Sequence, residues 1–583
     1  MSQGRVMGNL FRPLVISSVP ACLSLLLAVA SALAQQPIPG TGVRPGDKPL
    51  ELPDLRREET EPGVAQPPPR EPTQRLSGRI RVFVREIRLE GNTVFTDEQL
   101  RETVLDGYEN HWLGTEDLVR LRNELTQQYV DAGYVNSGAI IPDQDVSDQV
   151  ILVRIVEGKL PLDQIEINGL EILRDSYIRN RIALGIEDPL NVNPLREQLQ
   201  LLLQDTMIET INARLGPGIR PGDSRLEVDV VEAPRFAVDA FANNDRPISV
   251  GEYQGGVSAT ARSVLGFGDP LYASGSFTEG LNDGYGSYAI PLTADDLRFF
   301  VSGEYTDAEV VQQPFDELDI ESETWTVEFG LDYPFFRTPE LEISGGASFA
   351  RRHSQTSLLG RRFSFTEGAD EGEVNVSVLR FVQNARWRGE EQVAAVRSTF
   401  SWGIDAWNAT INDTGPDGRF FSWLGQTQYA RRLGEPGHEI VLRGDLQVAA
   451  DPLVSIEQYA VGGLFSVRGY RRNEIVRDNG WVASAEWRYP LLRLPIPRLS
   501  KTPEDGVFQV APFFDAGGGW NHGRETPSPN AIYSIGAGAR WSPAQRFSLA
   551  VYYGYPLKDV STEGDKGLQD YGVYFDVRIG QLW

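Results

Sequence analysis

The chain has 583 residues and a mean hydropathy of −0.29, which is too polar for a membrane protein built from helices. Acidic residues outnumber basic residues by 81 to 55, and the formal net charge of −26 argues against binding to nucleic-acid phosphates. Cys22 is the single cysteine and the 4 histidines are scattered, so we expect no disulfide, no metal site and no cofactor. Hydrophobic residues make up 41%, which is enough for the chain to fold.

The N-terminal residues 1–34 have the composition of a secretory signal peptide. Two arginines open the segment, an apolar run follows, and residues 32–34 read Ala-Leu-Ala, the small-x-small form of a cleavage site. A lipoprotein signal ending at Cys22 fits less well, because Pro20 lies there and the apolar run continues beyond it. We therefore predict an exported chain that starts at Gln35 and contains no cysteine, which suits the oxidising periplasm.

Residues 35–78 are rich in proline, which favours extended backbone and interrupts helices. Only residues 54–61 lack proline, and they have room for about two helical turns. We interpret this region as a linker with at most one short helix.

A small α/β pattern follows the linker and occurs twice. Residues 86–91 match residues 164–169, and residues 152–157 match residues 227–232. Each of these stretches alternates apolar and polar residues, as half-buried strands do. The order strand–helix–helix–strand–strand is therefore expected in each unit. The predicted units are residues 79–158 and 159–234.

Helix signals lie between the predicted strands of each unit. In the first unit, Thr96 and Gln99 form a capping box, and Thr115 opens a helix that Gly133 ends. In the second unit, the pair at 193–194, Asn-Pro, reads as an N-cap followed by proline at the first helical position.

Residues 235–583 show strict alternation of apolar and polar residues, and no stretch approaches 18 consecutive apolar residues. One face of each stretch is apolar with aromatic residues near its ends, and the other face is small, polar or charged. A transmembrane β-barrel with a water-filled lumen requires this pattern. Examples of the apolar face are Trp325, Val327, Phe329, Leu331 and Tyr333; Trp481, Ala483, Ala485, Trp487 and Tyr489; and Phe547, Leu549, Val551, Tyr553 and Tyr555.

Proline pairs mark several predicted strand ends: Tyr-Pro at 333–334, 489–490 and 555–556, and Ile-Pro at 290–291. Because proline tolerates strand ends but not strand centres, we expect these pairs at tight turns on one rim. The interval from Pro291 to Pro334 suits two strands with their loops, so the region should hold about sixteen antiparallel strands. A soluble β-sandwich also alternates, but the predicted export signal favours the membrane barrel.

Two motifs in this region point to a family. Residues 462–470 read Gly-Gly-Leu-Phe-Ser-Val-Arg-Gly-Tyr, and residues 513–517 read Phe-Phe-Asp-Ala-Gly. With two α/β repeats and a terminal barrel, the chain resembles the two-partner secretion transporters, exporters of haemolysins and filamentous haemagglutinin-like adhesins in the BamA-like superfamily. The resemblance covers nearly all of the predicted mature chain. It implies that the repeats are POTRA domains in the periplasm and that the barrel lies in the outer membrane of a Gram-negative bacterium.

The resemblance also implies roles for both motifs. In the family, the first motif is the tip of a long extracellular loop that folds back into the lumen. Its arginine pairs with the aspartate of a Phe-x-Asp motif on the wall, which implies that Arg468 contacts Asp515 and that Phe513 opens the second motif. An arginine can bind a carboxylate through two parallel hydrogen bonds. From the residues alone, a solvated arginine and an unrelated strand aspartate remain the alternative. The expected loop residues are Val467, Arg468, Gly469 and Tyr470.

The N-terminal region departs from the family pattern, whereas the C-terminal region fits it. The family has an N-terminal helix that plugs the barrel, whereas the prolines here leave only residues 54–61, so a plug helix is either short or absent. At the C-terminus the alternation continues to the end. Phe575 and Trp583 are expected to form the signal that the outer-membrane assembly machinery recognises.

We therefore expect a transporter, not an enzyme, that secretes a large unfolded exoprotein of the haemolysin or adhesin type without nucleotide hydrolysis. The exoprotein would bind the POTRA domains, where an extended chain can add to a sheet edge. An insertase for outer-membrane proteins and a passive porin with periplasmic binding domains are the alternatives. Enzyme motifs fit poorly: residues 346–350 lack the second glycine of a nucleophile elbow, and His438 has no second histidine for zinc.

Overall fold

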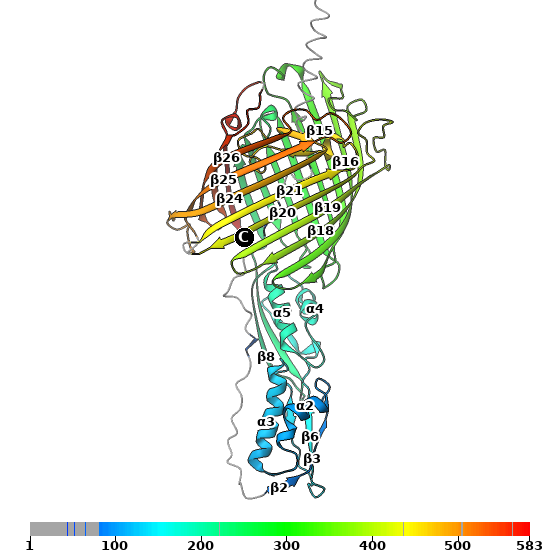
Figure 1. Cartoon of the computed structure of the whole chain (residues 1–583), viewed down its shortest axis with the longest axis vertical. Helices are drawn as coiled ribbons and strands as arrows, with labels where there is room; N and C mark the ends of the chain where they lie inside the picture. The colour runs from blue at the N-terminus through cyan, green and yellow to red at the C-terminus, as the bar shows by residue number, and fades with distance from the viewer. Residues whose placement is uncertain are drawn as a thin grey trace, which may run out of the picture.

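Two small α/β units are stacked below a β-barrel (Figure 1). The predicted signal peptide, residues 54–61 and Trp583 lie outside the residues that the structure describes. None of the described helices is both long and apolar enough to cross a membrane. The computed structural model describes residues 81–220, 222–434, 437–502, 505–562 and 564–582, and also Arg44, Leu50, Leu52 and Val64–Ala65.

The first α/β unit is a three-stranded sheet with two helices packed against it. Its elements are β3 (Glu86–Glu90), α2 (Asp97–Thr103), α3 (Thr115–Asp131), β5 (Gly138–Ile140) and β6 (Val150–Val156). The sheet order is β3-β6-β5, with β3 parallel and β5 antiparallel to β6. Leu121, Leu125 and Tyr129 of α3 are fully buried in the core, which explains the helical spacing of these residues. A small antiparallel pair that the sequence did not predict, β2 (Arg81–Val84) and β4 (His111–Gly114), precedes α3.

The second α/β unit repeats the same order of elements. They are β7 (Ile165–Asn168), α4 (Asp175–Ala183), α5 (Val192–Leu203), β8 (Ile208–Pro217) and β9 (Ser224–Glu232). β7 runs parallel and β8 antiparallel to β9. A short strand from the proline-rich region, β1 (Val64–Ala65), pairs in parallel with the free edge of β8. The predicted order strand–helix–helix–strand–strand is thus confirmed in the second unit, and in the first unit apart from the added pair β2 and β4.

Each unit also contains the same turn directly after its first strand. A glutamate at the end of the last strand, or just after it, binds the backbone of this turn. Gly91 and Gly169 follow the first strands with φ angles of +87° and +85°, which side chains other than glycine rarely adopt. The carboxylate of Glu157 binds the turn in the first unit. In the second unit, Glu232 accepts hydrogen bonds of 2.9 to 3.1 Å from the backbone N–H groups of residues 171–173. We call this arrangement the glycine–glutamate clasp.

In the first clasp, the Glu157 carboxylate accepts hydrogen bonds from the N–H groups of Thr93 (2.6 Å) and Val94 (3.0 Å) and from the Tyr129 hydroxyl (2.9 Å). Burial alone would raise the pKa of Glu157, but a hydrogen bond from the Thr93 hydroxyl together with these three outweighs it and holds the pKa below its usual range. Burial, and then the neighbouring carboxylate, raises the pKa of the Tyr129 hydroxyl above its usual value. The clasp therefore depends on an ionised glutamate.

Two helix starts agree with the sequence signals. Thr96 caps α2, and its side chain and that of Gln99 form the predicted capping box. α3 begins at Thr115, and Gly133 lies just past its end with a φ of +95°.

The predicted start of α5 is wrong by two residues. The side chain of Asn191, not Asn193, caps the helix, by accepting a hydrogen bond of 2.9 Å from the N–H of Asn193. Pro194 is then the third helical residue. A proline is tolerated there because the first turn of a helix has no intrahelical partner for its N–H groups.

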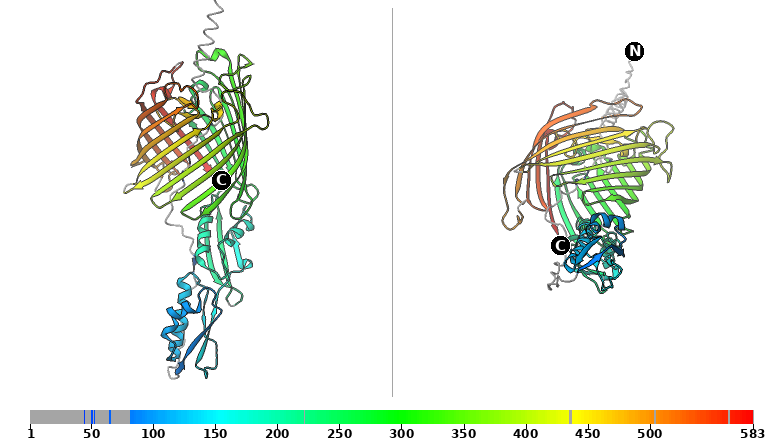
Figure 2. Two further views of the ribbon diagram at one scale, coloured as in Figure 1. Left: turned by 45° about the vertical axis from the view of Figure 1, so that its right-hand side comes forward. Right: turned by 60° about the horizontal axis from the view of Figure 1, so that its bottom comes forward.

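The C-terminal region is a closed antiparallel barrel of 16 strands, and Figure 2 shows the α/β units projecting from one end of it. The barrel closes because the last strand pairs with the first, with Ala240 opposite Ile579. Its strands are β10 (Phe236–Asn243), β11 (Gln254–Ala261), β12 (Leu271–Phe277), β13 (Leu281–Pro291), β14 (Arg298–Glu309), β15 (Ile320–Arg337), β16 (Leu341–Leu358), β18 (Glu373–Arg388), β19 (Gln392–Ile404), β20 (Phe421–Leu433), β21 (His438–Ala449), β24 (Asn479–Arg493), β25 (Val507–Trp520), β26 (Ala531–Ala544), β27 (Phe547–Pro556) and β28 (Val573–Leu582). A two-residue strand, β17 (Arg361–Arg362), pairs antiparallel with the end of β16.

The alternation in the sequence separates the two faces of the barrel wall. On β15, Val327, Phe329 and Leu331 are 45 to 47% exposed on the outside, whereas Thr324 is 1% exposed and faces the lumen. Such a belt of exposed apolar side chains is stable in lipid and unstable in water.

The proline pairs lie at both rims, so the prediction of a single rim is wrong. Neighbouring strands are antiparallel, so β13, β15 and β24 end at the rim beside the second α/β unit, whereas β27 ends at the opposite rim with the pair at 555–556. Pro334 and Pro490 lie inside strands, at positions where the register shifts. A proline marks a strand end or a distortion but carries no information about strand direction.

Candidate functional site

The connection between β21 and β24, residues 450–478, folds back against the inner wall of the barrel; we call it the lumenal loop. It contains a short antiparallel pair, β22 (Tyr459–Val461) and β23 (Ile475–Arg477). Val467 is fully buried in an apolar cluster that includes the wall residues Val482 and Ile532. The loop therefore lies against the inner face of the barrel wall.

Arg468 of the lumenal loop is held by two carboxylates of the wall. Its Nε and Nη2 donate to the two oxygens of Asp515 at 2.7 and 2.9 Å, and its backbone N–H donates to the same carboxylate at 3.1 Å. Its Nη1 donates to Glu486 at 2.5 Å. The side chains of Arg468, Glu486 and Asp515 are 7, 8 and 0% exposed. Such paired, fully hydrogen-bonded geometry is required for charges buried away from water.

Two aromatic rings cover the faces of the Arg468 guanidinium. Its central carbon lies 3.5 Å from the ring centre of Phe513 and 4.8 Å from that of Tyr552. These contacts add cation–π attraction to the ion pairs. Phe513, the first residue of the predicted wall motif, thus touches the same arginine as Asp515.

The residues after Arg468 fix the backbone of the loop tip. Gly469 has a φ of +99°, and a Cβ there would meet the carbonyl oxygen of Gly554 at 3.0 Å. Its N–H donates to the hydroxyl of Tyr574 at 3.0 Å. The hydroxyl of Tyr470 donates to the carbonyl of Tyr533 at 2.8 Å. The tip is therefore seated on β26, β27 and β28 as well as on the arginine.

Glu486 belongs to this site, although no motif identified it. It faces the lumen on β24, one inward position from Ser484, which pairs with Asp515 across the strands. The alternation of β24 would have placed Glu486 inside the barrel, but it carries no information about contact with a loop residue.

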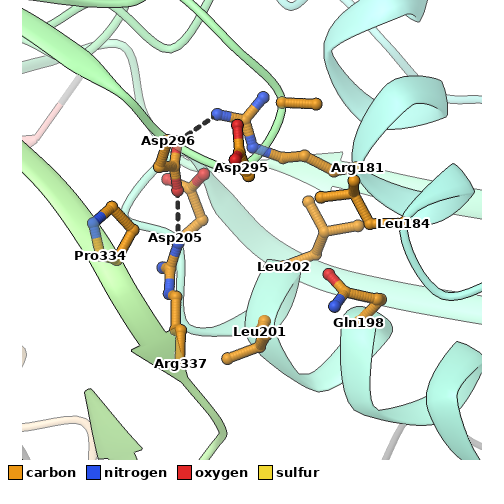
Figure 3. A pocket seen from close by; sticks show the side chains of 11 residues that line it. Arg181, Leu184, Gln198, Leu201, Leu202, Asp205, Asp295, Asp296, Pro334 and Arg337 are labelled. Carbon is orange, nitrogen blue, oxygen red and sulfur yellow. Dashed lines mark hydrogen bonds and ion pairs between the residues drawn. The ribbon is translucent and has the colours of Figure 1, made fainter. Parts of the chain in front are cut away.

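A second cluster, also missed by sequence reasoning, joins the second α/β unit to the barrel (Figure 3). Asp296, in the turn between β13 and β14, forms ion pairs with Arg181 of α4 and with Arg337 at the end of β15. Burial alone would raise the pKa of Asp296, but Arg298, Arg181 and Arg337 hold it below its usual range. We call this cluster the barrel joint.

Backbone contacts reinforce the barrel joint. The N–H of Arg174 donates to the carbonyl of Gly266 at 2.9 Å, and the Arg174 guanidinium lies 4.2 Å from the ring centre of Phe267. The side chain of Gln204 donates to the carbonyl of Pro339 at 2.9 Å. The second unit is therefore attached to several turns at one rim.

Described pieces of the proline-rich region also contact the barrel and the second unit. Arg44 is 3% exposed and lines a cavity of about 230 Å³ in the lumen. Leu52 packs against inward residues of β19, β20 and β21. Val64–Ala65 lies on the edge of β8, as described above.

The C-terminal residues that were expected to guide assembly are only partly described. Phe575 lies on β28, and its ring stacks on Tyr253 with ring centres 6.3 Å apart. Trp583 lies outside the described residues. Their role as an assembly signal stays a prediction.

A closed 16-stranded barrel with a lumenal loop, carried on small α/β units, defines the class of outer-membrane barrels with POTRA domains. The chain matches two family models: "POTRA domain, ShlB-type" over residues 82–158, and "Haemolysin secretion/activation protein ShlB/FhaC/HecB" over residues 222–541. The chain therefore belongs to the ShlB/FhaC/HecB family. It is an outer-membrane transporter of the two-partner secretion type, with its α/β units in the periplasm.

Individual relatives support this assignment. The chain is 22% identical over 510 residues to the heme/hemopexin transporter protein HuxB of Haemophilus influenzae, covering 81% of this chain and 83% of HuxB. It is 23% identical over 408 residues to the hemolysin transporter protein ShlB of Serratia marcescens, covering 68% and 70% of the two chains. The solved structure of CdiB from Escherichia coli has the same fold, with a TM-score of 0.62, 18% identity and coverage of 99% and 100%.

Proposed function

We propose that this transporter carries a large unfolded exoprotein, of the haemolysin or adhesin type, through its barrel past the lumenal loop. The observation that carries the proposal is the burial of Arg468 between Asp515 and Glu486 inside the barrel. A loop that is tied to the wall this tightly has one defined position, and that position determines how much of the lumen is open. Arg468 and Asp515 are the residues whose loss should disturb transport most.

We further propose that both α/β units are POTRA domains that bind the exoprotein as an added strand. An unfolded chain has unpaired backbone groups, and the edge of a sheet offers partners for them. The edge of β8 already accepts an extended segment of this chain, Val64–Ala65, in parallel pairing. The same edge is therefore suited in shape and hydrogen bonding to a segment of an exoprotein.

Folding outside the cell would supply the direction of transport. The periplasm contains no nucleotide to hydrolyse, and an extended chain in the lumen is free to move both ways. Once a segment folds at the cell surface, its return requires unfolding, which makes backward movement costly. The transporter then needs only to bind, align and admit the chain.

The test is the secretion of a large exoprotein encoded beside this gene. We expect the exoprotein in the medium or on the cell surface only when the transporter is present, while other outer-membrane proteins stay at normal levels. A general loss of outer-membrane proteins without the transporter would indicate an insertase. Secretion that continues unchanged would indicate a passive porin.

A further inference from the structure

A second buried ion cluster holds the lumenal loop to another part of the wall. Glu457 ends a short 3-10 turn, Ser455–Glu457, and its side chain is 1% exposed. Nη1 of Arg352, on β16, donates to the Glu457 carboxylate at 2.7 Å. Nη2 of Arg380, on β18, donates to both oxygens of the same carboxylate at 3.1 and 3.2 Å. Two wall cations thus share one loop carboxylate.

The backbone around Glu457 is fixed as firmly as its side chain. Nη1 of Arg352 also donates to the carbonyl of Ile456 at 2.8 Å. The side-chain amide of Gln447 donates to the carbonyls of Glu457 (3.0 Å) and Asp478 (3.1 Å), which ties the two ends of the lumenal loop together. Apolar contacts complete the seat, in a cluster that contains Leu453, Val454 and Ile456 of the loop with Ala350, Val374, Val376 and Val378 of the wall.

Among the ion pairs that hold the loop, which also include Arg471–Asp570 and Arg472–Asp245, these two clusters have opposite polarity. At Arg468 the loop supplies the cation and β24 and β25 supply the carboxylates, whereas at Glu457 the loop supplies the carboxylate and β16 and β18 supply the cations. Because the two clusters lie on different parts of the wall, the loop stretches across part of the lumen. It cannot leave this position as one body unless both ion clusters break.

The two clusters differ in their surroundings. Arg468 is enclosed by Phe513 and Tyr552. Arg352 and Arg380, in contrast, line the lumenal cavity of about 230 Å³. A chain that moves through this cavity passes directly beside the Glu457 cluster.

A second carboxylate is already close to this cluster. Glu328 of β15 lines the same cavity and lies 3.9 Å from Arg380. If Glu457 withdraws, Arg380 keeps a neighbouring anion, which lowers the cost of separating the pair. The Arg380–Glu457 contact, at the edge of the cavity, is therefore the part of this cluster that separates at the lowest cost.

We propose that the Arg352–Glu457–Arg380 cluster is the releasable anchor of the lumenal loop and that Glu457 is the positioning residue that sets the loop across the lumen. The role of this anchor in export rests on the proposed function, but the experiment that tests the anchor needs no exoprotein. A negative result in the anchor experiment would therefore leave the secretion assay unaffected. A negative secretion assay would likewise leave the result of the anchor experiment unaffected.

The experiment follows the loop with a single spin label in the full-length transporter. The predicted mature chain has no cysteine, so Ala460→Cys on β22 gives one labelling site beside Glu457. The label is placed in the otherwise native transporter, in Glu457→Gln, in Arg380→Gln and in the double variant. Glu304→Gln is the matched control, because it removes the same charge from the wall of the same cavity on β14. Electron paramagnetic resonance reports label mobility, and planar bilayers report conductance.

We expect a shift of the spectrum toward fast motion and a larger open-channel conductance in Glu457→Gln and in Arg380→Gln. The double variant should change no more than Glu457→Gln alone, because that substitution already removes the carboxylate that Arg352 and Arg380 share. Glu304→Gln should keep the immobile spectrum. An unchanged spectrum in both single variants, or the same shift in Glu304→Gln, would overturn the proposal. Heat-modifiable migration shows that the barrel is folded, and Arg380→Gln gives the same readout if Glu457→Gln does not assemble.

Discussion

Arg468 shows how much a single side chain depends on its geometry inside the barrel. Its guanidinium satisfies two carboxylates in its plane and two rings on its faces, and it has almost no contact with water. Lysine would retain the charge but would lose the planar fork that reaches both carboxylates and stacks on the rings. A conservative substitution at this position is therefore not conservative in function.

We predict that Arg468→Ala removes most secretion while the barrel still assembles. The variant leaves Asp515 and Glu486 buried without their cation, which should weaken the seating of the loop by about 3–5 kcal/mol. Arg468→Lys should restore only a small part of the activity. Exoprotein in the medium measures transport, and heat-modifiable migration measures assembly. Arg578→Ala, which removes an arginine from an exposed pair, is the control. Normal export by Arg468→Ala would show that the loop tip has no role in transport.

The contact between Arg468 and Asp515 was available from the sequence only through the family motifs. Alternation shows which residues of a strand face the lumen, and it places Glu486 there, but it cannot show which loop residue an inward side chain meets. The barrel joint was not predicted from the sequence for a related reason. Arg181 and Asp296 are 115 residues apart, and neither lies in a pattern that local propensity or periodicity describes.

Among the elements, the glycine–glutamate clasp makes a specific demand on ionisation. The pKa of Glu157 is lower in the folded unit than in the unfolded chain, so the carboxylate favours folding above the ordinary glutamate pKa of about 4.3. The contribution of Glu157 to the stability of the unit is lost as the pH falls through the lowered pKa of this carboxylate. The first unit should therefore keep its full stability across the pH range above about 5.

Glu157→Gln should destabilise the first α/β unit by about 1–3 kcal/mol and remove this acid dependence. One carboxylate oxygen accepts from both N–H groups and the Tyr129 hydroxyl, and the other accepts from the Thr93 hydroxyl; glutamine replaces one of these oxygens with an NH₂ group and removes the negative charge. Hydrogen exchange in the turn after Gly91, measured on the full-length transporter, gives the local stability. Exchange rates equal to those of the native protein would mean that the clasp does not hold the turn.

The barrel joint is the element contact that sets the position of the second α/β unit. Asp296→Asn should loosen it, because Arg181 and Arg337 then face each other without the carboxylate that they share. We expect faster hydrogen exchange in α4 and unchanged exchange in the first unit. Arg179→Gln, which removes an ion pair within α4 itself, is the matched control. Equal protection of α4 in Asp296→Asn and the native protein would show that the backbone contacts alone hold the unit.

At the scale of the whole molecule, the outer wall determines the conditions in which the protein exists as a monomer. Its exposed apolar belt should make the purified transporter dependent on detergent or lipid. On removal of detergent we expect association within the time of a size-exclusion run, detected by light scattering. A folded, monodisperse protein in plain buffer would be incompatible with a lipid-facing wall.

The architecture was more predictable than its details. The barrel and both α/β units follow from periods of two and of 3.6 residues, which persist over many residues. The start of α5 was misplaced because Asn191 and Asn193 are both good caps, and only the fold selects between them. The pair β2 and β4 is too short to show a period. The rim at which the Tyr-Pro pair at 555–556 lies depends on the direction of its strand. A local sequence pattern does not determine that direction.

The glycine–glutamate clasp has a consequence for the history of the chain. Gly91 with Glu157 and Gly169 with Glu232 solve the same steric problem with the same two residue types at nearly the same spacing. Copying of one ancestral module within the gene accounts for this more simply than separate origins. Relatives could then gain or lose a complete module by recombination without redesign of the neighbouring one.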